Sequence, residues 1–257
     1  TDPKRLTALV LLGVRDEKQF PLIFYRSDCA DWALDENDID EPFIASAKAI
    51  VVTGTHFAKE NSARAQMKAI QLAKKHGRRV VFDVDYRPNL WGLSGHGDGE
   101  NRYIKSDQVT AHLSPILPYC DLIVGTEEEL AIAGGAEDTL ATIRAIRSVS
   151  TATIVCKRGP MGCVVFPGAI PDDIEKGIKG PGVEVYNVLG AGDAFMSGFL
   201  RGWLRDEPLE TTCAYANACG AFAVSRLLCA PEIPTWEELQ FFLKNGSPHR
   251  ALRHDSA

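Results

Sequence analysis

Residues 187–195, NVLGAGDAF, place a single carboxylate, that of Asp193, directly after three very small residues. Gly190, Ala191 and Gly192 allow the backbone to approach a ligand closely, and the apolar residues that follow predict a helix whose first N–H groups point at the same place. A carboxylate beside such an anion cradle can accept the proton of a hydroxyl group that attacks a phosphoryl group. A turn before a helix, with Asp193 at the helix cap, explains the same residues without a ligand, so this string alone leaves both interpretations open.

Polar residues also follow four predicted strands. The segments are TGTH at 53–56, DVDYR at 83–87, GTEEE at 125–129 and KRGPMG at 157–162. In open α/β sheets, ligands bind in the crevice beyond the carboxyl ends of the strands. The position of these segments therefore predicts that they line one binding crevice.

Two arginines point to a substrate that carries a carboxylate. Arg26 ends the predicted hairpin, and Arg87 precedes Pro88, which disfavours the helical conformation at Arg87 and extends it. A guanidinium group binds a carboxylate through two parallel hydrogen bonds, so two arginines in one crevice would suit a sugar acid. A surface salt bridge accounts equally well for Arg26.

Two of the segments that follow predicted strands have residues suited to binding a nucleotide and its metal ion. In KRGPMG, Gly159 and Gly162 leave room for phosphates and ribose beside Lys157 and Arg158, although a hairpin turn has the same composition. In GTEEE, Glu129 could hold Mg²⁺ through water, whereas three acids in the first turn of a helix are also favoured by the helix dipole.

The composition is that of a globular protein without a polyanionic partner. Of the 257 residues, 45% are hydrophobic and 24% are charged, and the net charge of −6 argues against binding nucleic acid. No apolar run is long enough for a membrane helix, so we expect no membrane partner. The seven cysteines contain no C-x-x-C pair, which predicts buried, reduced thiols and a cytoplasmic protein.

The order of apolar runs predicts an α/β fold. Continuous apolar runs alternate with helical periodicity, which is typical of a mostly parallel sheet covered by helices on both faces. The opening residues, RLTALVLLGVRDEKQFPLIFYR, predict a small β-hairpin around RDEKQ. The predicted strands are 47–54, 78–87, 120–126 and 152–159, and the predicted helices are 61–77, 140–150, about 194–206, 209–228 and one from 234 on.

Together these segments resemble the ribokinase-like, or PfkB, family of carbohydrate kinases over nearly the whole chain. GAGDAFMSGF is similar to the C-terminal signature of that family, which implies Asp193 as the catalytic base and Gly190 to Gly192 as the anion hole. KRGPMG resembles the nucleotide-side loop of the family, and YANACGAFAV, with Asn217, resembles its adenine-flanking helix. The resemblance implies ATP and Mg²⁺ as cofactors, with Mg²⁺ at Glu129, although Thr126 replaces an Asn of the family motif.

Within the family, FYR, DVDYRPNLW and NVLGAGDAF look most like kinases of keto sugar acids. The implied substrate is 5-dehydro-2-deoxygluconate, in myo-inositol breakdown, with Arg26, Arg87 and Asp193 around it. The nearest alternative substrate is 2-keto-3-deoxygluconate. A fructokinase- or ribokinase-type enzyme and an inactive nucleotide- or sugar-sensing module stay open, whereas a dehydrogenase is disfavoured because no G-x-G-x-x-G follows a first strand.

The resemblance also predicts how the chain is organised. We expect a lid hairpin at 1–30, a kinase core at 31–245 and a linker or tail at 246–257. The N-terminal region of the family fold has no counterpart here, and the last residues resemble a linker to a further C-terminal domain, so the chain is expected to be a piece of a longer protein. Members of the family often dimerise through the lid, which implies a homodimer. Asn187 and Val188 stand where the family usually has Asp and Thr.

Overall fold

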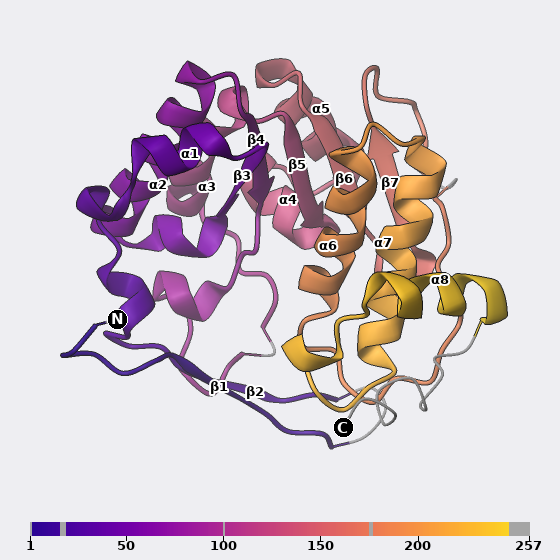
Figure 1. Cartoon of the computed structure of the whole chain (residues 1–257). Coiled ribbons are helices and arrows are strands. Elements are labelled where there is room, and N and C mark those ends of the chain that lie inside the picture. Colours follow the sequence, from indigo (N-terminus) through magenta and orange to yellow (C-terminus); the bar gives the residue numbers. More distant parts are fainter. Residues whose placement is uncertain (1, 16–18, 100, 175–176, 247–257) are drawn as a thin grey trace. The chain divides into compact units, whose positions relative to one another are not determined.

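The computed structural model describes residues 2–15, 19–99, 101–174 and 177–246 (Figure 1). The chain divides into two compact units. The first comprises Thr1–Leu11, Pro21–Lys157 and Val165–Glu175, and the second comprises Leu12–Phe20, Arg158–Val164 and Lys176–Ala257. The domain limits expected from the sequence stay predictions, and the middle of the RDEKQ linker and the expected tail from residue 247 on lie outside the described residues.

The main sheet has five strands in the order β3-β4-β5-β6-β7. These are β3 (Ala49–Thr53), β4 (Arg79–Asp83), β5 (Leu122–Thr126), β6 (Thr153–Lys157) and β7 (Cys163–Phe166). The first four are parallel, with Ile50 paired to Val80 and Val124 to Val155. The central residues of β4, β5 and β6 are fully buried, which explains why continuous apolar runs predicted these strands, whereas Val51 at the centre of the edge strand β3 is exposed.

Five α-helices flank this sheet in the first unit. They are α1 (Glu41–Ser46), α2 (Glu60–Lys75), α3 (Asp107–Leu113), α4 (Glu127–Gly134) and α5 (Thr139–Val149). The buried residues of α2 recur at helical spacing and form one face of the helix: Ser62, Ala65, Gln66, Ala69, Ile70 and Ala73. The expected fold class, a mostly parallel sheet flanked by helices, is confirmed. Helices α1 and α3 were not predicted.

A separate two-stranded sheet pairs β1 (Leu9–Leu12) with β2 (Leu22–Tyr25), which confirms the small antiparallel hairpin. Two backbone hydrogen bonds join β2 to the glycine-rich segment that follows β4. Phe24 N donates to His96 O at 3.1 Å, and Gly99 N donates to Leu22 O at 3.2 Å. Leu22 and Phe24 are buried, whereas Ile23 and Tyr25 on the other face are exposed. That the hairpin is a lid stays a prediction.

The second unit contains α6 (Ala191–Trp203), α7 (Leu209–Val224) and α8 (Trp236–Asn245). Glycines let α6 and α7 pack closely, since a Cβ on Gly198 would lie 2.6 Å from the carbonyl oxygen of Tyr215. The aromatic rings of Phe222 and Phe242 join α7 to α8 at a centroid distance of 5.7 Å. Helix α6 begins three residues before the predicted start at 194, so Asp193 lies inside its first turn.

All seven cysteines are free, and six of them are buried, as the sequence predicted; Cys229 is only partly buried. Among the described residues, no helix combines the length and the apolar character that a membrane span requires.

Candidate active site

The loops after β3 and β4 meet backbone to backbone at Gly54. A Cβ on Gly54 would lie 2.0 Å from the carbonyl oxygen of Val84, so a larger residue requires a backbone shift. The contact brings the Thr55 hydroxyl to 2.8 Å from both the carbonyl oxygen and the carboxylate of Asp85. Asp85 has φ +31°, a strained conformation for a residue other than glycine. Asp85, which the sequence placed at a strand end, is thereby held at the carboxyl edge of the sheet.

Arg87 and Lys157, both partly buried, form an ion cluster around the buried Glu129 where β4, β5 and β6 end. Arg87 donates from Nη1 to Glu129 Oε1 at 3.0 Å, and its Nη2 pairs with Asp85 Oδ1 at 3.0 Å. Lys157 Nζ lies 3.4 Å from Glu129 Oε2 and 3.5 Å from Asp83 Oδ1. Burial favours a raised pKa for Glu129, but the charges of Lys157 and Arg87 outweigh it and lower that pKa to about 2. The cluster therefore stays ionised at neutral pH.

Both carboxylate oxygens of Glu129 already have partners within the protein, Oε1 with Arg87 and Oε2 with Lys157. Thr126 and Glu129 form a capping box, in which Thr126 N donates to Glu129 Oε2 at 2.8 Å and Glu129 N donates to Thr126 Oγ1 at 3.2 Å. In the described part of the chain, no three His, Cys, Asp or Glu side chains group together as possible metal ligands. Direct magnesium ligation by Glu129 does not fit this arrangement, and the water-mediated contact expected from the sequence stays a prediction.

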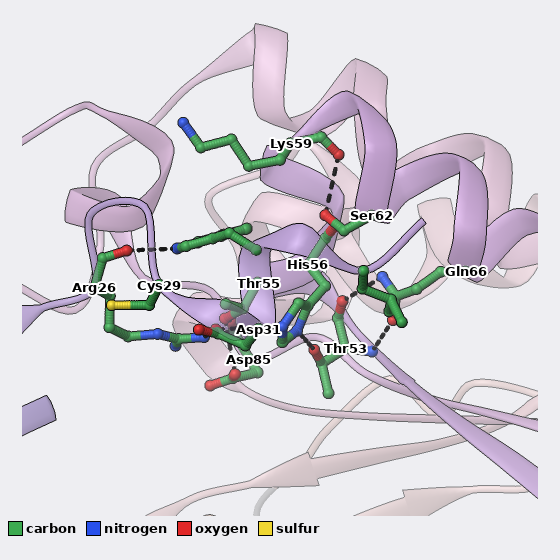
Figure 2. Close-up of polar contacts among 12 residues, drawn as sticks. Arg26, Cys29, Asp31, Thr53, Thr55, His56, Lys59, Ser62, Gln66 and Asp85 are labelled. Atoms are coloured by element: carbon green, nitrogen blue, oxygen red, sulfur yellow. Dashed lines mark hydrogen bonds and ion pairs between the residues drawn. The ribbon is translucent and has the colours of Figure 1, made fainter. Parts of the chain in front are cut away.

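Arg26 lies beside a second polar cluster at the carboxyl end of β3 (Figure 2). Its Nη2 atom donates to Asp31 Oδ2, which also lies 3.5 Å from Nε2 of His56. Nδ1 of His56 lies 3.2 Å from the hydroxyl oxygen of Thr53. Figure 2 shows Arg26, Asp31, His56 and Asp85 gathered in one place, so this cluster adjoins the edge that Asp85 and Arg87 occupy.

The start of α6 has the features of an anion cradle. Gly190, its N-cap, has φ +82°, and a Cβ there would lie 2.3 Å from Sγ of Cys229, so both the conformation and the space require glycine. Ala191, Gly192 and Asp193 form the first turn, where N–H groups lack acceptors within the helix. Such a turn fits the phosphate groups of ATP. The side chain of Asp193 is exposed on the same turn.

The loop before this cradle is braced by Asn187, which is 2% exposed. Its Oδ1 accepts a hydrogen bond from Leu189 N at 2.7 Å, and its Nδ2 donates to Leu227 O at 3.3 Å. Asn187 thus has a structural role where the sequence showed only a departure from the family pattern.

Gly162 and Asn217 meet at one carbonyl group in the second unit. A Cβ on Gly162, which has φ +83°, would lie 1.9 Å from Ile178 O, and Asn217 Nδ2 donates to the same oxygen at 2.6 Å. The loop itself is a tight turn, because Arg158 N donates to Gly162 O at 2.8 Å. The nucleotide roles of Lys157, Arg158, Gly159, Gly162 and Asn217 stay predictions.

The structure thus brings the predicted residues together in separate groups. Arg87, Glu129 and Lys157 form one group in the first unit, and Gly190 to Asp193 form another in the second. Sequence reasoning missed the contacts of Asp31 and His56. The only signal for His56 was its place in TGTH, directly after a predicted strand.

Comparisons with known proteins agree with these features. The model of a family described as pfkB family carbohydrate kinase matches residues 1–236. A curated protein named 5-dehydro-2-deoxygluconokinase from Geobacillus kaustophilus is 28% identical over 252 residues, which cover 95% of this chain and 71% of that protein. A protein of the same name from Clostridium perfringens is 32% identical over 227 residues, covering 87% of this chain and 63% of that protein.

Solved structures share the fold. A ribokinase II from E. coli in complex with ATP and Mg²⁺ has a TM-score of 0.77 at 19% identity, covering 94% of this chain and 72% of that chain. A fructokinase from Vibrio cholerae, bound to fructose, ADP and a calcium ion, has a TM-score of 0.74 at 24% identity, with 94% and 75% coverage. These likenesses confirm the ribokinase-like fold.

Proposed function

Because the chain belongs to the pfkB family of carbohydrate kinases, we propose that it phosphorylates the terminal hydroxyl of the keto sugar acid 5-dehydro-2-deoxygluconate. The observation that supports an acidic substrate is the position of two arginines, Arg26 and Arg87, in adjoining clusters at the carboxyl edge of the sheet. The names of the curated relatives support the same substrate. A place in myo-inositol breakdown belongs to this proposal, as does a cytoplasmic location, which suits seven free cysteines.

The two arginines differ in how far they are neutralised. Arg87 pairs with two carboxylates, those of Asp85 and Glu129. Among the described contacts, Arg26 pairs with one carboxylate, that of Asp31. Arg26 therefore keeps more attraction for an incoming carboxylate, and we assign it the direct contact. Arg87 shapes the neighbouring edge.

The remaining roles fall to the start of α6. Asp193 would accept the proton of the sugar hydroxyl, and the N–H groups of the first turn would stabilise negative charge on the transferred phosphoryl group. ATP, when bound, supplies that phosphoryl group. The positive φ of Gly190 and the exposed carboxylate of Asp193 support this assignment.

The test is ADP release from Mg-ATP with three acceptors in parallel: 5-dehydro-2-deoxygluconate, 2-keto-3-deoxygluconate and neutral fructose. Selective turnover of the first supports the proposal. A preference for the second changes the substrate and keeps the mechanism, whereas a preference for fructose contradicts the role of the arginines. A protein that binds the acids without releasing ADP is a sensing module.

Replacing Arg26 by Gln should raise KM for the sugar acid by about tenfold or more, because a hydrogen bond between charged groups contributes about 1.5–3 kcal/mol. The kcat should change less than KM, since Arg26 is assigned to the carboxylate and not to the reacting hydroxyl. Arg64→Gln is the matched control, as it removes an exposed arginine of α2 that pairs with Glu36 and Glu60. Equal losses with acidic and neutral sugars would count against a carboxylate contact.

A further inference from the structure

His56 occupies the centre of the cluster beside Arg26, and phosphoryl transfer as proposed gives it no task. Its Nε2 faces Asp31 Oδ2 at 3.5 Å, the same oxygen that accepts from Arg26. Its Nδ1 faces the hydroxyl of Thr53 at 3.2 Å. The imidazole therefore links the anionic partner of Arg26 to a neutral group that can either donate or accept a hydrogen bond (Figure 2).

The backbone and ring of His56 are held in place by α2 and by Trp32. Ser62 Oγ donates to the carbonyl oxygen of His56 at 2.6 Å, and both amide atoms of Gln66 bind the backbone of Thr53, at 2.9 and 3.0 Å. The indole of Trp32 lies 5.5 Å from the imidazole and donates to Arg26 O at 2.6 Å. Arg26, Asp31 and His56 thus keep their relative positions without a ligand.

A sugar carboxylate that binds Arg26 must compete with Asp31. The second oxygen of Asp31, Oδ1, is buried and has no hydrogen-bond partner among the described residues. If Arg26 turns to the substrate, His56 is the remaining group that an ion-pair contact gives to Asp31 in the described part of the chain. The Asp31 side chain is 29% exposed, so losing its cation costs less than it would for a fully buried carboxylate, but another cation nearby still offsets that cost.

We propose that His56 is a positioning residue for acid recognition, which takes up one proton when a sugar carboxylate binds Arg26 and then holds Asp31 as its ion-pair partner. This inference rests on the proposed function. The proton comes from solvent and enters at Nδ1, while Nε2–H stays directed at Asp31. The Thr53 hydroxyl, which donates to the neutral imidazole, rotates and accepts from the imidazolium.

The charges around His56 favour this sequence of events. Burial lowers the pKa of His56, and the charge of Arg26 lowers it further, against the opposing charges of Asp31 and Asp85. Lys59 lies over the ring of Trp32, 5.8 Å from its centroid, and adds a further positive charge near this cluster. The imidazole is therefore neutral at pH 7 in the free protein. A carboxylate that neutralises Arg26 removes the largest repulsive charge and raises the pKa.

The sign of the linkage follows. Because binding raises the pKa of His56, a proton is taken up, and the affinity for sugar acids rises as pH falls through the pKa of the bound state. The Kd changes by at most about tenfold per pH unit, the limit for one proton. A neutral sugar such as fructose leaves Arg26 paired with Asp31 and should show no such dependence.

The experiment is calorimetric binding of 5-dehydro-2-deoxygluconate and of 2-keto-3-deoxygluconate at pH 7, in buffers of different ionisation enthalpy. The dependence of the heat on the buffer gives the number of protons taken up, without turnover. We expect a fraction of one proton in the wild type and none with His56→Gln. Thr53→Val, which removes the acceptor for Nδ1–H and keeps the side-chain shape, should lower the uptake, whereas Thr53→Ser should preserve it.

His76→Gln is the control variant, because His76 makes another histidine–carboxylate contact, to Glu41 at 2.7 Å, at the end of α2. It should leave the proton uptake unchanged. A wild type that binds sugar acids without proton uptake overturns the inference and leaves the proposed function standing, and so does equal uptake in His56→Gln. Absence of binding by either acid overturns the inference and the proposed function together. The wild-type measurement decides even if a variant does not fold.

Discussion

Glu129 contributes to stability through its partners, and the contribution depends on pH. Its ordinary pKa is 4.5, and Lys157 and Arg87 lower it to about 2 in the folded protein. The stabilisation is therefore fully present above about pH 4.5 and is lost as pH falls towards 2. Urea unfolding at several pH values should show that the stability difference between wild type and Glu129→Gln narrows over this window. A constant difference would contradict the ion cluster.

Asp193 should matter for turnover and not for nucleotide binding. Asp193→Asn removes the proposed base and keeps the size of the side chain, so kcat should fall by about a hundredfold or more. Nucleotide affinity, measured by calorimetry, should stay the same. Asp172→Asn, at an exposed carboxylate that pairs with Arg144, should leave kcat unchanged. A kcat near the wild-type value in Asp193→Asn would reject the role.

At the scale of residues, the sequence predicted which residues lie at the carboxyl edge of the sheet better than it predicted what those residues contact. Glu129 and Lys157 stood out because each follows a strand, and both do lie at the carboxyl edge. Their mutual pairing was not predicted, since it joins residues far apart in the chain whose strands become neighbours only in the sheet. The same holds for Asp31 and His56, which meet through a short 3₁₀ turn (Ala30–Ala33) that no sequence pattern marked.

Among the elements, helix α6 depends on the glycine that starts it. Gly190→Ala should reduce both stability and kcat, because the left-handed conformation costs about 1–2 kcal/mol and the new Cβ meets Cys229 Sγ. Adding Cys229→Ala should restore part of the loss, since it relieves the contact and not the backbone strain. Gly246→Ala, at φ +70° with nothing within 4 Å, measures the strain alone. Urea unfolding of the three variants checks this, and equal losses for Gly190→Ala and Gly246→Ala would contradict it.

The elements themselves were predicted where burial is strong. The four parallel strands and helices α2, α5, α7 and α8 appear in the sequence as long apolar or periodic runs. Helices α1 and α3 are too short for such a signal and depend on caps: Asp40 accepts from Phe43 N at 2.6 Å, and Ser106 accepts from Val109 N at 3.3 Å. A capping residue alone is too common to predict a helix of one or two turns.

For the whole molecule, the homodimer expected from the sequence would form through the exposed face of the hairpin. The exposed face of β1 and β2 carries Leu9, Leu11, Ile23 and Tyr25, the last 54% exposed. If the expected dimer forms there, light scattering should give a dimer for the wild type and a monomer for Leu11→Lys. Val51→Lys, at another exposed apolar residue, should leave the dimer intact. A dimer that persists in Leu11→Lys would place the interface elsewhere.

The backbone contact between Gly54 and Val84 has a consequence for changing the accepted sugar by directed evolution. In a library that varies only the loop after β3, or only the loop after β4, the other loop keeps its wild-type backbone. That fixed backbone limits the conformations, and therefore the substitutions, that the varied loop can accept. Positions 55, 56, 85 and 87 should therefore be randomised together, with glycine retained at 54. Natural variation should follow the same rule, and new specificities would arise through paired substitutions in the two loops.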